Sequence, residues 1–394
     1  MIQIKSEAAI SAQHGLLASA WDSNESFIFT PSPCPVTDEW LRTLIRRLPS
    51  ELYEDHFGIL TSGSTGTPKL IMGSKYRTGE LSRLINEHQQ LEPVQNAILA
   101  LPLPYSYSLV NQWLWAHIHG KTLHSTRGMA DPQSLFRALQ CHSASMLCLV
   151  GSQVPLLRRY VEPGMQFPEV LRLNFAGGPF PQADLSWLHE IFPSAIIFHN
   201  YGCTEALPRL TIRPASDFDD PMTLGAPLPG VELDIDASGG LRFRSAFGCD
   251  LIADDDHIQL VQRDEWIATG DQAERLESGH FRLLGRNSEV FKRHGEKVSL
   301  AILAYSLGQA WNGELAFYLE TAPDGENGHV LILSPVPGQP AVRKLLLHLR
   351  EHFRRPLWPI RIEGVEAIPL SANGKPDTTT LCQLPRTQLW KQIL

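Results

Sequence analysis

A run of small hydroxylated residues and glycines, closed by a proline and a lysine, is the clearest candidate for chemistry in the sequence. Its order is Leu60-Thr61-Ser62-Gly63-Ser64-Thr65-Gly66-Thr67-Pro68-Lys69. The glycines let the backbone approach a ligand closely, and the hydroxyl groups, N–H groups and lysine suit a polyanion such as a triphosphate. The spacing differs from the Walker pattern, because no Gly-Lys pair follows a glycine of this run by four residues. Taken alone, the run indicates a surface loop as readily as a phosphate loop.

Four other short motifs combine glycines with aromatic, acidic or basic residues along the rest of the chain. They are Phe175-Ala176-Gly177-Gly178-Pro179, Asn200-Tyr201-Gly202-Cys203-Thr204-Glu205, Thr269-Gly270-Asp271 followed by Gly285-Arg286, and Pro369-Leu370-Ser371-Ala372-Asn373-Gly374-Lys375. Each has a simpler structural interpretation by itself. Tyr201 would belong to a core, Asp271 to a turn, and Lys375 to an exposed Asn-Gly turn. The motifs gain weight because all of them occur in one chain.

Together with the first run, these motifs resemble the motifs of the adenylate-forming superfamily, in the same order. That superfamily contains acyl-CoA and aryl-CoA synthetases, peptide-synthetase adenylation domains and firefly luciferase. The resemblance covers about residues 57–378, and Leu70 departs from it, because a glycine usually follows the lysine. The resemblance implies that the chain binds ATP and Mg²⁺ and activates a carboxylic acid as an acyl-adenylate.

The same resemblance assigns roles to individual residues. Tyr201 would stack on the adenine, Asp271 would accept hydrogen bonds from the ribose hydroxyls, and Glu205 would hold Mg²⁺. Lys375 would bridge the carboxylate and phosphate oxygens, and Thr204 would contact the α-phosphate. The expected catalytic residues are Lys375, Thr204 and Glu205, and the expected metal ligand is Glu205. The expected nucleotide- and cofactor-binding residues are Thr61, Ser62, Gly63, Ser64, Thr65, Gly66, Lys69, Gly177, Gly178, Pro179, Asn200, Tyr201, Gly202, Asp271, Arg286 and Gly295.

The segment Tyr105-Ser106-Tyr107-Ser108 aligns with the start of the helix that lines the substrate pocket in this superfamily. Members that activate amino acids carry an aspartate where this chain has Ser106, and that aspartate pairs with the α-ammonium of the substrate. A buried ammonium without a counter-charge is costly, so we expect an aryl or acyl acid and not an amino acid. The candidate pocket residues are Tyr105, Ser106, Ser152 and Ala176.

The second half-reaction implied by the resemblance is transfer of the acyl group to a thiol. In the superfamily a hinge follows the Gly-Arg pair, and Ser288 occupies the hinge position here, where aspartate or lysine is usual. Lys292, Arg293 and Lys297 form a basic patch beside Gly295, which is either solvated surface or a contact for the phosphates of CoA or carrier-protein phosphopantetheine. Attack by a thiolate on the mixed anhydride would give a thioester. Two alternatives remain open: transfer to an amine or other nucleophile, and nucleotide binding without catalysis.

Composition and charge argue against several other functions. The 394 residues include 34 basic and 42 acidic residues, which leave a net charge of −8, so nucleic-acid binding is not indicated. The six cysteines form no C-x-x-C pair, which argues against a zinc site and a disulfide framework. No apolar run is long enough to span a bilayer, and the N-terminus lacks the pattern of a signal peptide. We therefore expect a cytoplasmic enzyme whose partners are a small carboxylic acid and, as a candidate, an acyl carrier protein.

Short apolar runs that alternate with amphipathic segments must position these motifs. The runs 57–60, 97–101, 146–150, 171–175 and 195–199 are expected strands, and 37–48, 79–91, 133–139 and 182–191 are expected helices. This alternation predicts βαβ units and a parallel sheet, whose carboxyl edge collects ligand sites. Residues 231–235, 241–245, 258–261 and 281–284 are expected to be short strands of a small β subdomain. From residue 299 the expected order is helix, strand, strand, helix and strand.

The expected fold class is α/β, with a large N-terminal domain of mainly parallel sheet layers and a small, mobile α+β C-terminal domain. The expected boundaries are 1–287 for the adenylation domain, with the β subdomain at about 209–287, and 288–394 for the C-terminal lid domain. Only 60 residues precede Thr61, fewer than the superfamily usually has, so we expect part of the first subdomain to be absent or replaced. A sheet edge or apolar face exposed in this way could be covered in a homodimer.

Overall fold

The computed structural model describes residues 2–13, 15–61, 68–217, 220–369 and 376–392. The chain forms two compact units. The first comprises Met1–Gly270 and Leu276–Phe281, and the second comprises Asp271–Arg275 and Arg282–Leu394. The domain boundary expected between residues 287 and 288 remains a prediction.

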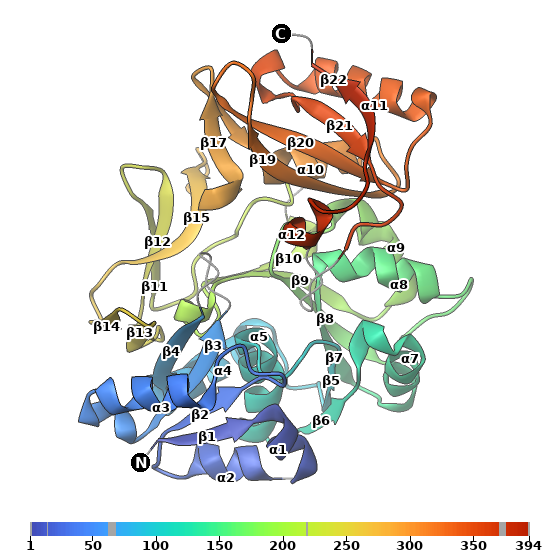
Figure 1. Cartoon of the computed structure of the whole chain (residues 1–394). Coiled ribbons are helices and arrows are strands. Elements are labelled where there is room, and N and C mark those ends of the chain that lie inside the picture. Colours follow the sequence, from blue (N-terminus) through green and yellow to red (C-terminus); the bar gives the residue numbers. More distant parts are fainter. Residues whose placement is uncertain (1, 14, 62–67, 218–219, 370–375, 393–394) are drawn as a thin grey trace. The chain divides into compact units, whose positions relative to one another are not determined.

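The first unit contains a mixed six-stranded sheet near the N-terminus of the chain (Figure 1). Its strands, in spatial order, are β1 (Gln3–Ser6), β2 (Phe27–Thr30), β3 (His56–Thr61), β4 (Lys69–Ser74), β13 (Leu251–Ala253) and β14 (Ile258–Leu260). β1, β2 and β3 run parallel, whereas β4, β13 and β14 each pair antiparallel to the strand before them in that order. The β3–β4 hairpin brings the two ends of the serine- and glycine-rich run together, because Thr61 lies opposite Lys69.

Helix α3 (Asp38–Arg47) packs on this first sheet, and its sequence explains why it forms. Thr37 caps the amino end, where its hydroxyl oxygen accepts a hydrogen bond from the backbone N–H of Trp40 at 3.1 Å. Acidic residues lie in the first turn and basic residues in the last, as the helix dipole favours. Its apolar stripe shares one core cluster with residues of β2, β4 and β13, namely Leu41, Leu44, Ile45, Ile28, Leu70, Met72 and Leu251. The helix expected over 37–48 is confirmed. Two shorter helices, α1 (Glu7–Ala12) and α2 (Leu16–Asp22), lie between β1 and β2 in the chain.

The second sheet of this unit carries the motifs around Gly177 and Tyr201. Its strands, in spatial order, are β10 (Thr211–Pro214), β9 (Ile196–Tyr201), β8 (Val170–Ala176), β7 (Ser145–Val150), β5 (Asn96–Leu99) and β6 (Thr122–Ser125). Neighbouring strands are parallel, except that β10 is antiparallel to β9. Helices α7 (Pro132–Cys141), α8 (Val154–Tyr160) and α9 (Leu185–Ile191) connect successive parallel strands, and Figure 1 shows them along one side of the sheet. The parallel α/β architecture expected from the sequence is confirmed here.

The three helices bury a continuous apolar core against the second sheet. Leu135, Leu157 and Leu188 of α7, α8 and α9 belong to one cluster with Leu147 and Leu173 of the strands, and each of these side chains is fully buried. Burying an aliphatic side chain contributes roughly 1.5–3 kcal/mol. The Phe167 ring joins the ends of this core, because its centroid lies 5.3 Å from that of Phe136 and 5.5 Å from that of Phe192. The sheet edge that bears the motifs is therefore carried by a rigid, well-packed layer.

The remaining elements of the first unit lie in two parts of the chain, between β4 and β6 and after β10. The segment between β4 and β6 contains α4 (Lys75–His88), α5 (Ser106–Ser108), a π-helical segment (Leu109–Leu114) and α6 (Trp115–Ile118). After the second sheet, β11 (Val231–Ile235) and β12 (Gly240–Ser245) form an antiparallel hairpin. The chain passes between the two units within β15 (Ile267–Arg275) and β16 (Phe281–Arg286).

The second unit is an α+β fold. A hairpin of β17 (Val290–Arg293) and β18 (Glu296–Ser299) precedes a four-stranded sheet of β19 (Glu314–Thr321), β20 (Asn327–Ser334), β21 (Arg361–Gly364) and β22 (Thr387–Lys391). Its helices are α10 (Leu300–Gly308), α11 (Gln339–His352) and α12 (Thr378–Leu381). Leu303 of α10 and Leu345 of α11 share a buried cluster with Leu331 of β20 and Ile362 of β21. The order of helix, strand, strand, helix and strand expected from residue 299 is confirmed.

Two sheet assignments differ from the sequence-based expectation. Residues 57–60 were expected in the same parallel sheet as the later strands, but β3 belongs to the first sheet and pairs with β2 and β4. Residues 258–261 were expected in the β subdomain, but β14 extends the first sheet through β13. The two differences have separate causes. β3 pairs with the strands next to it along the chain, and β4 was not recognised as a strand from the sequence. β14 joins the first sheet through β13, whose other partner β4 lies far away in the chain, and local patterns do not reveal such a pairing.

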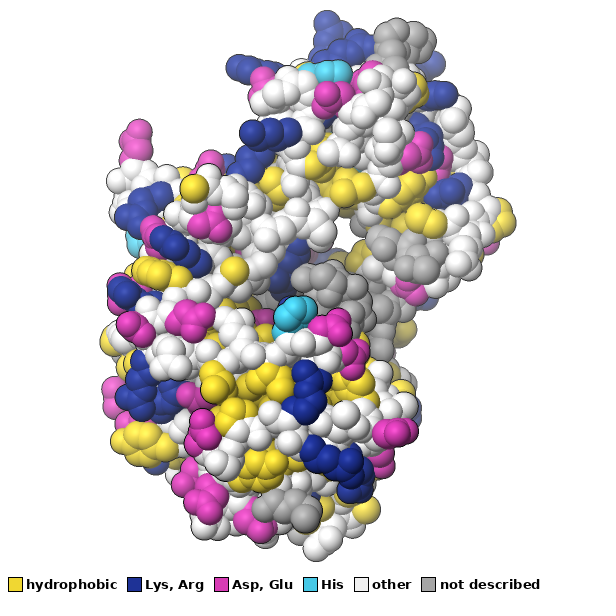
Figure 2. Space-filling view, turned by 60° about the vertical axis from the view of Figure 1, so that its left-hand side comes forward, with side chains coloured by type: hydrophobic (Ala, Val, Ile, Leu, Met, Phe, Trp, Pro, Cys, Tyr) yellow, Lys and Arg dark blue, Asp and Glu magenta, His cyan; other side chains and the backbone are white. Residues whose placement is uncertain are grey.

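The surface charges and the apolar content of the helices bear on what the chain could contact. Figure 2 shows basic and acidic side chains interspersed on the face that it presents. None of the helices in the part of the chain that the structure describes is both long enough and apolar enough to cross a membrane.

Candidate active site

The carboxyl ends of three neighbouring parallel strands bring several of the expected site residues to one edge of the second sheet. Val150 at the end of β7 is paired with Ala176 at the end of β8, and Phe175 is paired with His199 near the end of β9. The residues that follow these ends are Ser152, Gly177, Gly178, Pro179, Gly202, Thr204 and Glu205. In an open α/β sheet this edge is where ligands bind.

The glycine turn after β8 is held in place by a buried histidine. Gly177 has a φ of +79°, which a residue with a side chain rarely adopts. The carbonyl oxygen of Gly178 lies 3.1 Å from Nε2 of His199, so that nitrogen must carry the hydrogen that it donates. Burial of His199, reinforced by nearby Arg213, lowers its pKa to about 3. His199 is therefore neutral near pH 7 and fixes the turn as a hydrogen-bond donor.

The turn after β9 folds back so tightly that Gly202 leaves no room for a side chain. A Cβ atom at Gly202 would lie 1.9 Å from the carbonyl oxygen of Pro208. Leu207 adopts a φ of +54° within this turn. Its side chain packs on Gly73 of β4, where a Cβ atom would lie 2.0 Å from Cδ1 of Leu207. Because Gly202 and Gly73 have no side chains, the turn that carries Thr204 can pack closely on the β3–β4 hairpin.

Thr204 and Ser106 lie side by side. The Oγ atom of Ser106 is 3.4 Å from Oγ1 of Thr204, so the expected pocket-lining segment reaches the expected catalytic turn. Glu205 follows directly, and its carbonyl oxygen accepts a hydrogen bond from the backbone N–H of Cys249 at 2.9 Å. The Glu205 side chain is half-buried.

The remaining pocket candidates, and Tyr201, lie near the same edge of the second sheet and differ in how far their side chains are exposed. Tyr105 precedes α5 and is 41% exposed, and partial burial raises the pKa of its hydroxyl. Ser152 is exposed, in a short turn after β7, and Ala176 is half-buried at the end of β8. Tyr201, at the end of β9, is buried.

Asn200 has a structural role that the sequence did not indicate. It is 1% exposed, and its Nδ2 donates to Oδ1 of Asn174 at 2.9 Å, while its Oδ1 accepts from Nε2 of Gln89 at 3.2 Å. The same Nε2 of Gln89 also lies 2.7 Å from Oδ1 of Asn174. Three side-chain amides therefore satisfy one another inside the sheet. Polar residues inside otherwise apolar strands, such as Asn174 between Leu173 and Phe175, are the sequence signal for such a network.

The expected phosphate loop is only partly within the described residues. Thr61 and Lys69 are the described ends of the β3–β4 hairpin, and both are half-buried. Five other expected members of the loop, and the expected catalytic lysine, lie outside the described residues: Ser62, Gly63, Ser64, Thr65, Gly66 and Lys375.

In the second unit, Asp271 and Arg286 form an ion pair. Nη1 of Arg286 lies 3.2 Å from Oδ1 of Asp271, and the side chains are 45% and 8% exposed, respectively. Gly295 occupies the tight turn between β17 and β18 with a φ of +80°. Ser288 lies in the short turn Asn287–Glu289, where the Glu289 carboxylate accepts a hydrogen bond from the backbone N–H of Arg286 at 3.2 Å.

The basic patch expected beside Gly295 contains two residues rather than three. Lys292 and Lys297 are exposed and directly opposite each other across the β17–β18 hairpin. Arg293 is instead 1% exposed, and its Nη2 lies 3.5 Å from Oδ2 of Asp324. Alternation along a strand places the Arg293 side chain on the inner face, which corrects its assignment to the surface.

Glu205 is the only residue that we expected to hold a metal ion. In the described ranges, no group of three or more histidine, cysteine, aspartate or glutamate side chains could enclose one. Mg²⁺ is commonly held by one or two carboxylates together with substrate phosphates and water.

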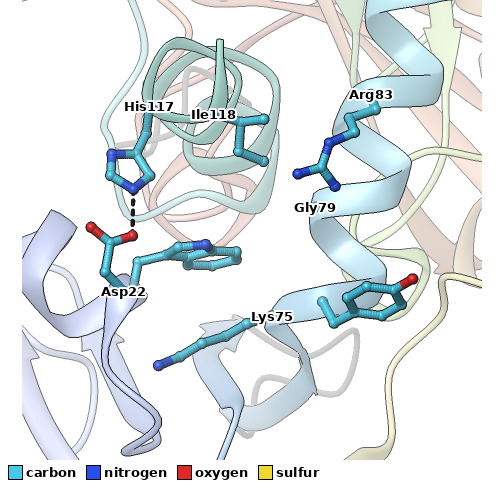
Figure 3. Close-up of a pocket in the computed structure, with 8 residues that line it drawn as sticks. Asp22, Lys75, Gly79, Arg83, His117 and Ile118 are labelled. Atoms are coloured by element: carbon cyan, nitrogen blue, oxygen red, sulfur yellow. Dashed lines mark hydrogen bonds and ion pairs between the residues drawn. The ribbon is translucent and has the colours of Figure 1, made fainter. Parts of the chain in front are cut away.

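A pocket of about 360 Å³ in the first unit is lined by other residues (Figure 3). Its lining consists of Trp21, Asp22, Lys75, Tyr76, Gly79, Arg83, His117 and Ile118. Nε2 of His117 lies 2.7 Å from Oδ1 of Asp22, and Nζ of Lys75 donates to the carbonyl oxygens of Ala20, Ser23 and Glu25 at 2.7–2.8 Å. These interactions join α2 and the segment before β2 to α4 and α6.

Comparison with known proteins identifies related chains. Residues 48–244 match the model of a family described as AMP-binding enzyme. The chain is 22% identical to the non-ribosomal peptide synthetase CmlP of Streptomyces venezuelae, over 98% of this chain and 39% of that protein. It is 24% identical to the D-alanine–D-alanyl carrier protein ligase of Bacillus licheniformis, over 83% of this chain and 71% of that protein. The chain thus spans well under half the length of the first of these relatives.

The fold is also similar to that of a solved structure. The anthranilate CoA ligase AuaEII in complex with anthranoyl-AMP superposes with a TM-score of 0.75, over 97% of this chain and 77% of that chain, at 16% sequence identity. The similarity is one of fold, and it covers nearly the whole chain.

Proposed function

Because the chain belongs to the AMP-binding enzyme family of the adenylate-forming superfamily, we propose that it joins a carboxylic acid to AMP and then transfers the acyl group to a thiol. The first step consumes ATP and releases pyrophosphate, and the second releases AMP and gives a thioester. The acid is an aryl or acyl acid, and the thiol is that of CoA or of a carrier-protein phosphopantetheine. The similarity to a carrier protein ligase supports a thiol acceptor.

The single observation that carries this proposal is the approach of Ser106 to Thr204, at 3.4 Å between their hydroxyl oxygens. An acid bound beside Ser106 would lie within reach of the phosphate that Thr204 contacts in the proposed reaction. Ser106 offers a hydroxyl group and no negative charge, so it cannot neutralise an α-ammonium. The pair therefore supports activation of an acid that lacks an α-amino group.

The protein's own residues bind and orient the reactants in this reaction. The substrate carboxylate is already ionised near pH 7, so its oxygen can attack the α-phosphorus without a general base, and the bond from the α-phosphorus to the leaving pyrophosphate breaks. Tyr201 and the turn held by His199 would support the adenine, and Asp271 the ribose. Glu205 would hold Mg²⁺, which supplies positive charge for the leaving pyrophosphate. Lys375 would stabilise the negative charge that develops during transfer.

The test of the first step is carboxylate-dependent exchange of pyrophosphate into ATP, with a panel of aryl, fatty and amino acids. We expect exchange with at least one aryl or fatty acid, and a loss of about 100-fold or more in the Lys375→Ala and Glu205→Gln variants. Lys391→Ala, at an exposed lysine of β22, is the matched control. Absence of exchange with every acid would contradict the proposal and favour nucleotide binding without catalysis.

The test of the second step adds CoA or a holo carrier protein to the acid that supports exchange. A mass increase on the thiol that equals the acyl group would establish the acceptor. If AMP is released only when an amine is supplied, the alternative of transfer to an amine replaces the thiol.

A further inference from the structure

Arg209 carries a positive charge that lacks a negative partner among the described residues. It is 1% exposed and follows the turn that contains Thr204. Its Nη2 donates to Oδ1 of Asn111 at 2.7 Å, whereas its Nη1 is buried and has no hydrogen-bond partner among the described residues. A guanidinium stays protonated at any physiological pH. A buried, protonated guanidinium needs a counter-charge, because desolvation without one is costly.

The groups that surround Arg209 are neutral near pH 7. Its guanidinium carbon lies 5.6 Å from the centroid of the Tyr107 ring, and burial raises the pKa of the Tyr107 hydroxyl well above its ordinary value. Burial likewise raises the pKa of the nearby Cys148 thiol to about 12. Asn111 is an amide. None of these groups can supply the missing negative charge.

A second buried arginine, in contrast, has carboxylates beside it. Arg213 of β10 is 2% exposed, its Nε donates to the carbonyl oxygen of Thr223 at 2.8 Å, and the carboxylates of Asp220 and Asp217 act on its charge. Arg209 has no such carboxylate within the described part of the chain. The two arginines therefore differ in whether a carboxylate of the described residues balances their charge. At Arg209 a carboxylate of a ligand could take that place.

Arg209 also belongs to the neighbourhood of the proposed active site. It contacts Tyr107, which directly follows Ser106 in the sequence, and Ser106 lies against Thr204. Asn111, its hydrogen-bond partner, lies in the π-helical segment Leu109–Leu114. Single π-helical turns within α-helices occur frequently at functional sites.

We propose that the activated acid carries a second carboxylate, and that Arg209 binds this carboxylate as its counter-charge. The proposal rests on the proposed function and names the class of its substrate as a dicarboxylic acid. Nη1 supplies a donor that the described residues leave unused, and a guanidinium and a carboxylate are matched in shape and charge. A monocarboxylic acid of the same skeleton would leave the buried charge of Arg209 unpaired.

The test compares matched pairs of acids in the pyrophosphate exchange assay. Each pair shares a skeleton and differs by the second carboxylate, for example benzoate against isophthalate and hexanoate against adipate. We expect kcat/KM for the best dicarboxylate to exceed that for its monocarboxylate by about tenfold or more. Equal or greater use of the monocarboxylates would overturn the proposal and leave the proposed function standing. Absence of exchange with every acid would overturn both.

Variants assign the preference to Arg209. Arg209→Met is expected to reduce the preference for the dicarboxylate to about onefold, and Arg209→Lys to keep part of it. Arg213→Met is the matched control, because it removes a buried arginine that has carboxylate neighbours, and it is expected to leave the preference unchanged even if it lowers Tm. If Arg209→Met does not fold, the preference of the wild type and that of Arg209→Lys still test the proposal. An unchanged preference in a folded Arg209 variant would overturn the role of Arg209.

Discussion

Arg286 and Asp271 face each other across the strand pair through which the chain passes between its two units, with Nη1 of Arg286 3.2 Å from Oδ1 of Asp271. The Asp271 side chain is 8% exposed. Its carboxylate oxygens can accept hydrogen bonds from two hydroxyl groups at once, as the proposed contact with ribose requires. The guanidinium of Arg286 orients this carboxylate and offsets part of the cost of burying its charge.

We predict that Arg286→Ala raises the KM for ATP by about tenfold, because Asp271 loses a charged partner that fixes its orientation. The measurement is ATP-dependent pyrophosphate exchange with saturating acid. Arg282→Ala is the matched control, since Arg282 lies on the same strand and pairs with Glu274 at 3.2 Å, with both side chains about one-third or more exposed. We expect that control to change KM by less than twofold. Equal effects of the two substitutions would refute a specific role for Arg286.

The buried state of His199 predicts a dependence of stability on pH. Its pKa is about 3 in the folded chain and about 6.5 when unfolded. Below pH 6.5 the unfolded chain binds a proton that the folded chain does not, so stability is full above pH 6.5 and falls as the pH decreases toward 3. The slope for one such histidine approaches about 1.4 kcal/mol per pH unit within that window.

His199→Gln removes this titration and is expected to flatten the decline of the urea midpoint between pH 7 and pH 4.5. His257→Gln is the matched control, because the His257 side chain is 84% exposed, and we expect its profile to follow that of the wild type. An unchanged slope in His199→Gln would mean that His199 takes up its proton in the folded state as readily as in the unfolded state.

Gly202 is a position where an added methyl group should disrupt the local structure. Its Cβ atom would lie 1.9 Å from a backbone oxygen, so the Gly202→Ala variant must shift the turn that carries Thr204. We predict a lower Tm and a loss of pyrophosphate exchange of about 100-fold, since small misplacements of reacting groups have effects of this size. For stability, Gly178→Ala is the control, because its Cβ atom would meet nothing within 4 Å, and we expect its Tm to stay within about 2 °C of the wild type. A Gly202→Ala variant with wild-type Tm and exchange would contradict the tight turn.

The sequence predicted individual elements well and their long-range pairing poorly. The runs that became β7, β8 and β9 are short, mainly apolar and flanked by turns, so their identity is local information. The β4 strand was missed because Lys69 was interpreted as the end of the serine- and glycine-rich run and no element was assigned to residues 70–74. Only the pairing with β3 reveals the hairpin. Ser106 and Thr204 are 98 residues apart in the chain. The resemblance assigned Ser106 to the substrate pocket and Thr204 to the α-phosphate, and the fold shows that their hydroxyl groups are neighbours.

Buried polar residues were the least predictable part of the site. Asn200 stands inside a motif, so the resemblance grouped it with the nucleotide-binding residues, whereas its side chain bonds Gln89 and Asn174. Arg209 follows the same motif and has a charge that usually indicates an exposed residue. Whether a polar side chain points into a core depends on the tertiary fold. The local signal is a polar residue inside an otherwise apolar strand, as at Asn174, and Arg209 has no such signal.

Asn200 offers a last prediction that separates structure from nucleotide binding. In Asn200→Leu, two buried amides lose a hydrogen-bond partner, so we predict a loss of about 1–3 kcal/mol in the free energy of unfolding, measured by urea denaturation. The KM for ATP should change by less than threefold in the folded variant, because the Asn200 side chain is already occupied within the protein. Asn96→Ala is the control, since Asn96 is only half-buried and its Nδ2 donates to the carbonyl oxygen of Ser143 at 2.7 Å near the surface. A large rise in the KM for ATP without a loss of stability would show that Asn200 contacts the nucleotide instead.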